Sequence, residues 1–469
     1  MAPGNATPPV PGLRSNYLSL IENLAQTLGV LTPSGTISVI IPLLILSAGN
    51  GTWVLLLITL SIFMLVMLSV IRFASLHASA GSLASFTRLG LGASGGLVGG
   101  WIYLLGVLFC VPSAMLAAAA YFDLALVPWL GPSTGPLRVA GITALITLGA
   151  WLAAHRDIKL STNLMLVVEC VSLSLMVVML VGAMFFAHAW VDRAQLQLSG
   201  VHFSGLQGGL VLAFMLMGGF EGTTCLGEES QDPRKTIPQA MLRCMLPLTL
   251  LYLLVSYSLV SLQTRGVIAP QADGLTVPFD SIARALGWPR LGPLSSFGVG
   301  ISYFGCGLGS VIVTSRVLFS MSRDGHFWRR FGEAHPRNGT PHRAIGLIAV
   351  LSIIIPVVML ADGAQLSLSI NVLSQLGSLG LIGGYLLVVV ALPIYLRRQG
   401  LLAHRDLVLT AAAAAMLLIV LVLTVYPRPP APYDYLPYIF VAAVLAGILI
   451  SVLRSLMPPQ WRRIARPRL

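Results

Sequence analysis

Charge is what this sequence lacks most. Only 9% of its 469 residues are charged, whereas 56% are hydrophobic. Soluble domains carry about 25% charged residues and cover their surfaces with them. The composition therefore argues against a soluble globular protein and indicates a chain that crosses a membrane several times.

Long loops are also missing, because apolar runs follow one another closely. A helix needs about 18 or more apolar residues to cross a hydrocarbon core of about 30 Å. Twelve runs qualify: 20–48, 52–75, 93–122, 136–154, 160–187, 203–227, 237–262, 294–322, 343–361, 366–395, 406–426 and 433–455. The longest loop, 263–293, is too short to fold alone. We expect an all-α polytopic membrane protein with twelve spans and no soluble domain.

The basic residues predict the orientation of the chain. If both termini are cytoplasmic, six of the 28 Lys and Arg residues fall outside, namely Arg138, Arg193, Arg265, Arg284, Arg290 and Arg428. The excess of basic residues inside agrees with the positive-inside rule. The net charge of +12 is scattered over cytoplasmic loops and the tail. We therefore expect contact with anionic membrane lipids and no binding of nucleic acid.

Catalytic and metal-binding motifs are absent as well. The sequence has no H-E-x-x-H, Ser/His or two-carboxylate motif at helical spacing, so we expect no enzyme. The five cysteines lie in apolar runs without paired spacing: Cys110, Cys170, Cys225, Cys244 and Cys306. We expect neither disulfides nor a metal site nor a cofactor. The start "MAPGNATPPVPG" lacks the features of a cleaved signal peptide, and the tails are too short for a soluble sensor domain.

Two of the apolar runs contain helix breakers near their middle. Run 20–48 has Pro33 and Gly35, and run 203–227 has the glycines Gly218, Gly219 and Gly222 around Glu221. Such residues also kink or pack ordinary membrane helices. Broken helices at matching positions five spans apart, however, are typical of a transporter site, because unwound backbone survives in a membrane only where it lines a cavity.

The breaks suggest how a small zwitterion would bind. A helix that stops within the membrane leaves N–H or C=O groups unpaired, and these carry partial charges of opposite sign. N–H groups and hydroxyls of Thr32, Ser34, Gly35 and Thr36 would bind a carboxylate. Free carbonyls from Gly218 to Phe220 would face an ammonium group.

Glu221 stands in an apolar setting where a full charge costs about 3 kcal/mol or more. It therefore needs a partner, or it is protonated for part of the time. One interpretation is a protonated carboxyl that hydrogen-bonds across the broken helix, and the other is a role in gating or proton handling.

Several segments resemble one known family in the same order. The stretch "GGFEGTTCLGEESQDPRKTIPQAML", residues 218–242, resembles the sixth helix and following loop of the amino acid–polyamine–organocation (APC) permeases. "SRVLFSMSRDGHF" followed by "TPHRAI" is similar to their eighth helix and its loop, and "SAGSLASFTRLGLG" to the segment before the third.

The resemblance implies a fold and a division of the chain. The family has two inverted repeats of five helices, with helices 1 and 6 discontinuous, as in the sodium-coupled leucine transporter. We expect a cytoplasmic tail at 1–19, the transport core at 20–395, two additional helices at 396–455 and a basic tail at 456–469. In span 6 the aromatic gate of the family would fall at Met215, where this sequence departs from the pattern.

Lys159 is the residue that the resemblance connects with ion coupling. The chain has 26 Arg and only two Lys, and Lys159 opens the fifth span. It corresponds by position to the fifth-helix lysine that replaces a sodium ion between helices 1 and 8. An alternative is an ordinary anchor with a snorkelling amine. Thr314 and Ser315 keep a sodium site open.

Other polar residues leave two interpretations open. Glu22 and Glu169 are intramembrane carboxylates that are functional by default or merely paired. Glu228, Glu229 and Asp232 suggest a cytoplasmic gate or a structural network, and Asn371 and Gln375 line a pocket or pack. The sequence predicts a secondary transporter of amino acids in the cytoplasmic membrane, a monomer or homodimer, coupled to protons rather than sodium. The alternative is an amine or polyamine carrier, or an exchanger, of the same fold.

Overall fold

The computed structural model describes residues 13–131, 136–156, 158–214, 216–268 and 278–456, and these residues are mainly helical. They form no β-strand, apart from one isolated bridge between Leu18 and Ser230. The polypeptide is thus all-α, as the composition predicts.

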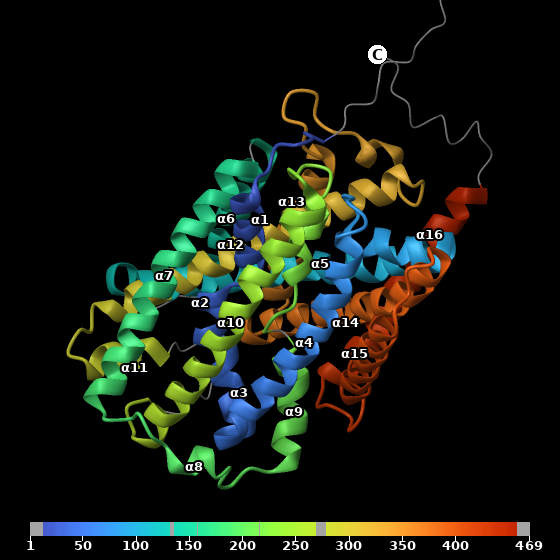
Figure 1. Ribbon diagram of the computed structural model, residues 1–469. Coiled ribbons are helices and arrows are strands. Elements are labelled where there is room, and N and C mark those ends of the chain that lie inside the picture. The colour runs from blue at the N-terminus through green and yellow to red at the C-terminus, as the bar shows by residue number, and fades with distance from the viewer. Residues whose placement is uncertain (1–12, 132–135, 157, 215, 269–277, 457–469) are drawn as a thin grey trace, which may run out of the picture.

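The helices follow one another with short connections (Figure 1). The α-helices are α1 (Leu20–Leu31), α2 (Pro33–Gly35), α3 (Ile41–Ala48), α4 (Thr52–Ala74), α5 (Ser82–Leu130), α6 (Pro136–Arg156), α7 (Ile158–Phe186), α8 (Arg193–Leu196), α9 (Phe203–Ala213), α10 (Pro233–Thr264), α11 (Pro278–Ala285), α12 (Leu291–Arg323), α13 (His342–Ala361), α14 (Leu366–Arg398), α15 (His404–Leu423) and α16 (Leu436–Leu456). Tighter or wider turns are η1 (Thr36–Ile40), η2 (Gly49–Gly51), η3 (Phe220–Leu226), η4 (Arg329–Gly332) and η5 (Tyr433–Tyr435).

Within the described residues, ten helical segments are long and apolar enough to cross a membrane. Two differences separate this number from the twelve runs in the sequence. The first segment, Leu20–Ala74, covers both of the first two predicted spans. The predicted span 203–227 is divided between α9 and η3, neither of which is long enough to be included.

Two local features depart from simple apolar spans. Gly92 has φ 79° and ψ −168° inside α5 and bends the helix at the residue before the predicted third span. The region 263–293, which the sequence suggests is a loop, contains the amphipathic helix α11. Its buried residues Phe279 and Ile282 pack on the bundle, which apolar run length alone does not reveal.

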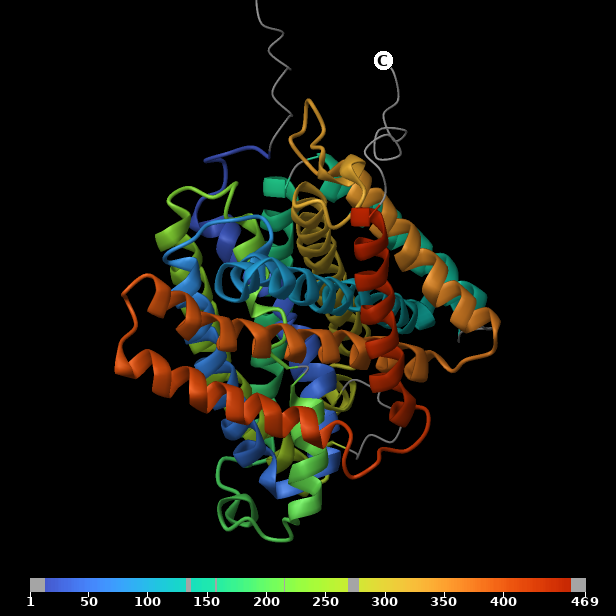
Figure 2. The same ribbon diagram turned by 90° about the vertical axis from the view of Figure 1, so that its right-hand side faces the viewer.

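Helices α5 and α14 cross the bundle next to each other, as Figure 2 shows. Their backbones touch at Gly106 and Gly380, where a Cβ on Gly380 would lie 2.3 Å from Cα of Gly106. Small residues permit such close approach of helices in membranes. This contact holds α14 beside α5, and both helices contribute to the cavity described below.

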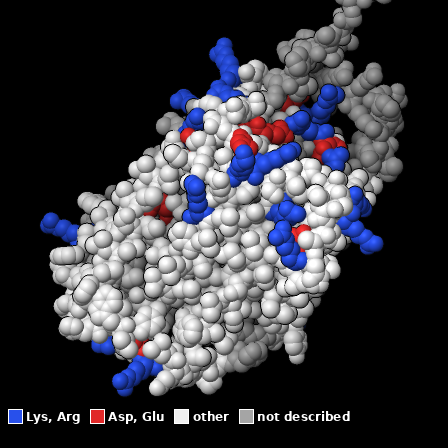
Figure 3. All heavy atoms as spheres, in the orientation of Figure 1, with Lys and Arg blue, Asp and Glu red and all other residues white. Residues whose placement is uncertain are grey.

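The described chain begins and ends at the same end of the bundle, since the start of α1 and the end of α16 both lie toward the upper end in Figures 1 and 2. In Figure 3 most visible Lys and Arg residues gather toward that end, above a broad uncharged area. Large apolar side chains such as Leu145, Val171 and Leu445 are exposed on the outer surface. An uncharged, apolar flank of this kind fits a multi-pass membrane protein.

Candidate functional site

The first span is interrupted at Thr32. Helix α1 ends at Leu31, Thr32 takes a left-handed backbone with φ 44°, and Pro33 begins the next helical stretch. Proline has no N–H to continue the helix, and its ring clashes with the preceding turn. The interruption falls in the run from Thr32 to Thr36, where the sequence predicts it.

The sixth span is interrupted at glycine. Helix α9 ends at Ala213, and Gly219, with φ 97°, precedes η3. A Cβ on Gly219 would lie 2.4 Å from Cγ1 of Val30 in α1, so only glycine suits both the backbone conformation and the space. The two interruptions therefore pack directly against each other. Met215, the expected gate position, lies outside the described residues.

A cavity of about 120 Å³ lies at the two interruptions. Thr32 and Thr36 line it from the first span, and Gly218 lines it from the sixth. Helices α5, α12 and α14 supply most of the remaining wall. The lining residues, all in the described part of the chain, include no Asp, Glu, Lys or Arg. Such a cavity suits a ligand whose own charges balance.

Two of the expected carboxylate donors point elsewhere. The N–H of Ser34 donates to Oε1 of Glu169 in α7 at 2.7 Å, and the N–H of Gly35 donates to Oγ of Ser302 in α12 at 3.3 Å. Glu169 is 3% exposed, so its carboxylate is held at the start of the second half-helix. Neither Ser34 nor Gly35 lines the cavity, whereas Thr32 and Thr36 do.

A second, smaller cavity of about 40 Å³ adjoins the first. Gly219, Glu221 and Gly222 line it, and Gly218 belongs to the linings of both cavities. Glu221 is therefore close to the larger cavity but is not part of its wall.

Glu221 is fully buried, and two tyrosines hold its carboxyl group. The hydroxyl of Tyr103 in α5 donates to Oε1 at 3.0 Å, and the hydroxyl of Tyr385 in α14 donates to Oε2. Tyr385 in turn accepts from the N–H of Gly219 at 3.0 Å. The ring of Phe220 stacks on Tyr385, with centroids 5.3 Å apart. This network joins the broken sixth span to α5 and α14 without an arginine or lysine.

Lys159 lies away from both cavities. Its Nζ is 4.2 Å from the centroid of the Tyr17 ring, just before α1. Glu169 of the same span contacts both the first-span break, at Ser34, and Ser302 of α12. In α12, Thr314 and Ser315 donate their hydroxyls to carbonyls of Ser310 and Ile312 in the same helix. Within the described residues, no group of three or more His, Cys, Asp or Glu side chains could hold a metal ion.

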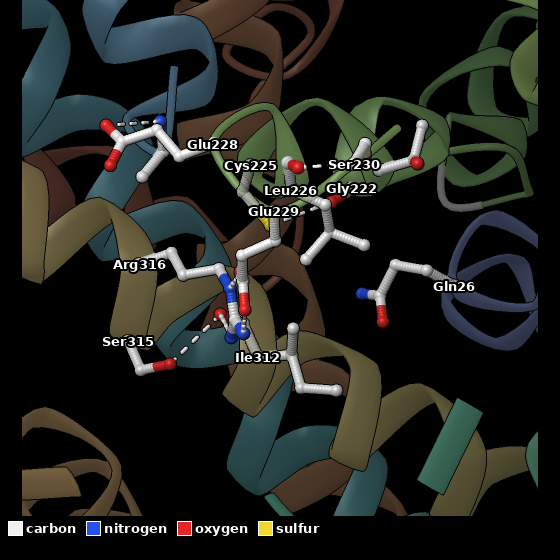
Figure 4. A network of polar contacts seen from close by, with 12 residues as sticks. Gln26, Gly222, Cys225, Leu226, Glu228, Glu229, Ser230, Ile312, Ser315 and Arg316 are labelled. Atoms are coloured by element: carbon white, nitrogen blue, oxygen red, sulfur yellow. Dashed lines mark hydrogen bonds and ion pairs between the residues drawn. The ribbon is translucent and has the colours of Figure 1, made fainter. Parts of the chain in front are cut away.

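A charged network closes the end of the core nearer the termini (Figure 4). Arg316 of α12 makes a bidentate pair with Glu229, and both side chains are 2% exposed. Glu228 pairs with Arg323 at 3.1 Å, and Asp232 pairs with Lys235 at 3.0 Å. The basic partners of the two glutamates therefore both come from α12.

The same network includes the start of α1. The carbonyl of Glu229 accepts from the N–H groups of Tyr17 and Leu18, at 2.7 and 2.9 Å. Oδ1 of Asn23 accepts from the hydroxyls of Thr223 and Ser230. Helix α1, the segment after η3 and α12 are thus bound together on this side of the cavity.

Sequence reasoning missed the groups that surround the two carboxylates. Tyr103, Tyr385 and Ser302 lie in distant helices, and a single apolar run gives no indication of which helices will be neighbours. Of the two span-10 candidates, Asn371 lines the larger cavity and Gln375 does not. The spacing of polar residues along α14 could have indicated this, since it repeats on one helical face.

Comparison with known proteins places the chain among transporters. The family model described as amino acid permease matches residues 18–450. An uncharacterized transporter of Mycobacterium tuberculosis is 24% identical over 337 residues, covering 71% of this chain and 72% of the relative. The branched-chain amino acid permease BcaP of Bacillus subtilis is 23% identical over 370 residues, covering 75% of each. The low-affinity putrescine importer PlaP of Escherichia coli is 25% identical over 302 residues, covering 60% and 62%.

These relatives are transporters rather than enzymes, and they carry amino acids or amines where their names give a substrate. The family match extends over nearly the whole chain and includes both helix interruptions. The protein belongs to the amino acid permease family of the APC superfamily.

Proposed function

We propose that this protein is a secondary active transporter that moves amino acids across the cytoplasmic membrane by alternating access. The observation that carries the proposal is the uncharged cavity at two interrupted helices. Non-helical backbone is tolerated at membrane depth only where it is buried in protein or lines a cavity, and broken helices are typical of transporter sites. The family match supports the same class of function.

The proposed topology has twelve spans in two inverted repeats of five plus two additional helices. Dividing the segment Leu20–Ala74 in two, and counting α9 with η3 as one broken span, raises ten segments to twelve. Both ends of the described chain lie at one end of the bundle, and basic residues gather there. This arrangement favours a cytoplasmic location for both termini. The core would be 20–395 and the additional helices 396–455.

The proposed substrate is a zwitterion held at the two breaks. The hydroxyl of Thr32 would donate to its carboxylate, and that of Thr36 would do so by turning from the carbonyl of Leu31, to which it donates at 3.3 Å. Carbonyls near Gly218 would accept from its ammonium group. The N–H groups of Ser34 and Gly35, which already bond to α7 and α12, would hold the second half-helix in place. The protein then needs no charged side chain in the cavity wall.

We further propose that protons rather than sodium drive accumulation. Glu221 is the proposed coupling carboxyl, because it lines the cavity that adjoins the substrate cavity and its carboxyl group accepts from two phenols rather than from a basic side chain. Lys159 would act at the other side, beside Tyr17, where the start of α1 is bound to Glu229. One proton moving inward across 100 mV contributes about 2.3 kcal/mol, enough for roughly fifty-fold accumulation.

Uptake into proteoliposomes tests this function. The purified full-length protein is reconstituted and given a panel of labelled amino acids in sodium-free buffer, with and without an inward proton gradient. Gradient-driven accumulation of at least one member is expected. Accumulation that appears only after sodium is added to the outside buffer would identify sodium as the coupling ion, and absence of uptake for every amino acid would contradict the proposed substrate class.

The alternative is an amine carrier, which the similarity to a putrescine importer favours. A diamine would bring two positive charges into a wall whose described residues offer no carboxylate. The same assay with decarboxylated analogues distinguishes the two: uptake of amines without uptake of the parent amino acids would favour the amine carrier.

A further inference from the structure

The cavity wall contains both apolar and polar side chains, and most of the polar ones come from α14. From the first span, Val39, Ile40 and Leu43 present hydrocarbon. From α14, four polar residues line the cavity: Ser367, Asn371, Ser374 and Ser378. Their spacings of four, three and four residues place them along one face of the helix. A substrate in this cavity therefore meets neutral hydrogen-bonding groups on its α14 side.

A second observation comes from Tyr121 of α5. Its side chain lines the cavity and is only 1% exposed, yet its hydroxyl has no hydrogen-bond partner within the part of the chain that the structure describes. The ring is fixed by stacking on Tyr303, with centroids 5.9 Å apart and planes 5° apart. A buried hydroxyl without a partner is unfavourable by about 1–3 kcal/mol, so this hydroxyl is available to hydrogen-bond with a ligand in the cavity.

The wall also restricts the charge of the ligand. It carries no acidic or basic side chain among the described residues, so a lysine-like or glutamate-like side chain would lose water without gaining an ion pair. The α-carboxylate and ammonium groups of an amino-acid substrate bound at the breaks balance each other's charge. The wall therefore favours a substrate whose side chain is neutral.

We propose that the substrate is an α-amino acid with a small, neutral, hydrogen-bonding side chain, and that Tyr121 together with the polar face of α14 recognises its hydroxyl or carboxamide group. The inference rests on the proposed transport function and names the substrate class for the same cavity. Tyr121 is then a specificity-determining residue.

The chemistry predicts which competitor the site rejects. A purely apolar pocket discriminates poorly against a ligand that adds a hydroxyl group. A site built around a hydrogen bond, in contrast, rejects the isostere that lacks it, because its own polar group is left unpaired. Threonine and valine form such an isosteric pair, differing by a hydroxyl in place of a methyl group.

The experiment measures uptake of labelled L-threonine by the full-length protein in proteoliposomes, with L-valine, L-serine and L-alanine as competitors. We expect threonine to be preferred over valine by about tenfold, the factor that 1.4 kcal/mol represents. Tyr121→Phe is expected to remove most of that preference by weakening threonine and serine while leaving valine and alanine within about twofold. Ser374→Ala and Ser378→Ala should act in the same direction.

Two matched controls test whether the effects belong to the cavity. Ser369→Ala removes a hydroxyl that donates to Gln365 within α14 and does not line the cavity, and Tyr438→Phe removes an exposed phenol of α16. Both should keep the wild-type preference. Monodispersity and the melting temperature of each variant separate misfolding from altered selectivity.

The outcomes are distinct. Wild-type preference for valine, or an equal loss of all four substrates in Tyr121→Phe, would overturn the inference, since the hydroxyl would then serve the shared backbone or the fold. Transport of branched-chain amino acids alone would overturn it while leaving the transport function intact. If no amino acid is transported at all, the proposed function itself fails.

Discussion

The cavity and the closed end of the core use opposite chemistry. The described cavity wall holds no charged side chain, whereas the segment after η3 and the end of α12 hold the pairs Glu229–Arg316 and Glu228–Arg323. Both regions use the first span and α12. Charge in a dry environment is tolerated only when it is paired, so the ion pairs stabilise this end of the core in the arrangement seen here. Because the described cavity wall is neutral, the charges of a bound substrate must balance each other or be met by backbone groups and hydroxyls.

The largest expected effect is the loss of the buried pair. Arg316→Met leaves Glu229 buried without a counter-charge, and removing one partner of a buried pair costs about 3–5 kcal/mol. The melting temperature in detergent measures the effect. Arg323→Met is the matched control, because the Arg323–Glu228 pair has side chains 53% and 36% exposed. Exposed pairs contribute about 0–1 kcal/mol.

The double variant Glu229→Gln/Arg316→Met sharpens the result. Removing both charges should restore part of the stability lost in Arg316→Met, because no unpaired buried charge remains. If Arg316→Met and Arg323→Met destabilise equally, the closed end is not held by the buried pair.

Glu221→Gln tests the other region. Glutamine keeps the size of the side chain, but its carboxamide cannot release and rebind a proton as a carboxyl group does. The proton-driven accumulation, about fifty-fold at 100 mV for one proton, should fall to the level without a gradient. Exchange of internal for external substrate, which needs no net proton movement, should continue. Accumulation unchanged in this variant would show that another group couples the proton.

The places of the breaks were accessible from sequence because they depend on local backbone chemistry. Pro33 lacks the N–H that would continue a helix, and Gly219 can adopt φ 97° at no steric cost. These rules act within a few residues of the chain but do not suffice alone, since Pro112 lies inside α5 and Pro356 inside α13 without ending either helix. The matching positions of the two breaks, five spans apart, supplied the rest of the information.

The partners of the breaks were not accessible in the same way. Glu169 reaches Ser34 across 135 positions, and Tyr385 reaches Glu221 across 164. Which helix faces which is decided by packing, for example by the glycine contact between α5 and α14. The direction of the Ser34 N–H, away from the cavity, depends on that packing and not on the identity of the residue.

Gly219→Ala should destabilise the protein more than the same substitution at a left-handed glycine with open space around it. A Cβ there meets both a positive φ and Val30 at 2.4 Å, whereas Gly363 has φ 83° with no atom within 4 Å of an added Cβ. The left-handed backbone alone costs about 1–2 kcal/mol for alanine. Gly363→Ala should therefore lose that amount, and Gly219→Ala more, with lower uptake. Melting temperatures and transport rates of the two variants provide the comparison.

Val30→Ala in the Gly219→Ala background separates the two causes. It removes the side chain that the new Cβ meets but not the backbone strain, so partial recovery of uptake is expected. No recovery would mean that the backbone conformation alone requires glycine.

Lys159→Ala has the smallest expected effect because the amine contacts Tyr17 at the periphery of the closed end and does not reach the cavity. Loss of a partly buried cation–π contact of about 1 kcal/mol corresponds to about a five-fold change in an equilibrium. Proton-driven accumulation should fall by about that factor, while substrate affinity stays unchanged. Lys235→Ala is the control, since its side chain is 76% exposed and pairs locally with Asp232. If Lys159→Ala weakens substrate binding as strongly as cavity variants do, the separation of a neutral binding region from a charged closure is wrong. If it leaves accumulation untouched, Lys159 has no part in coupling, and Glu221 becomes the sole coupling candidate of the two.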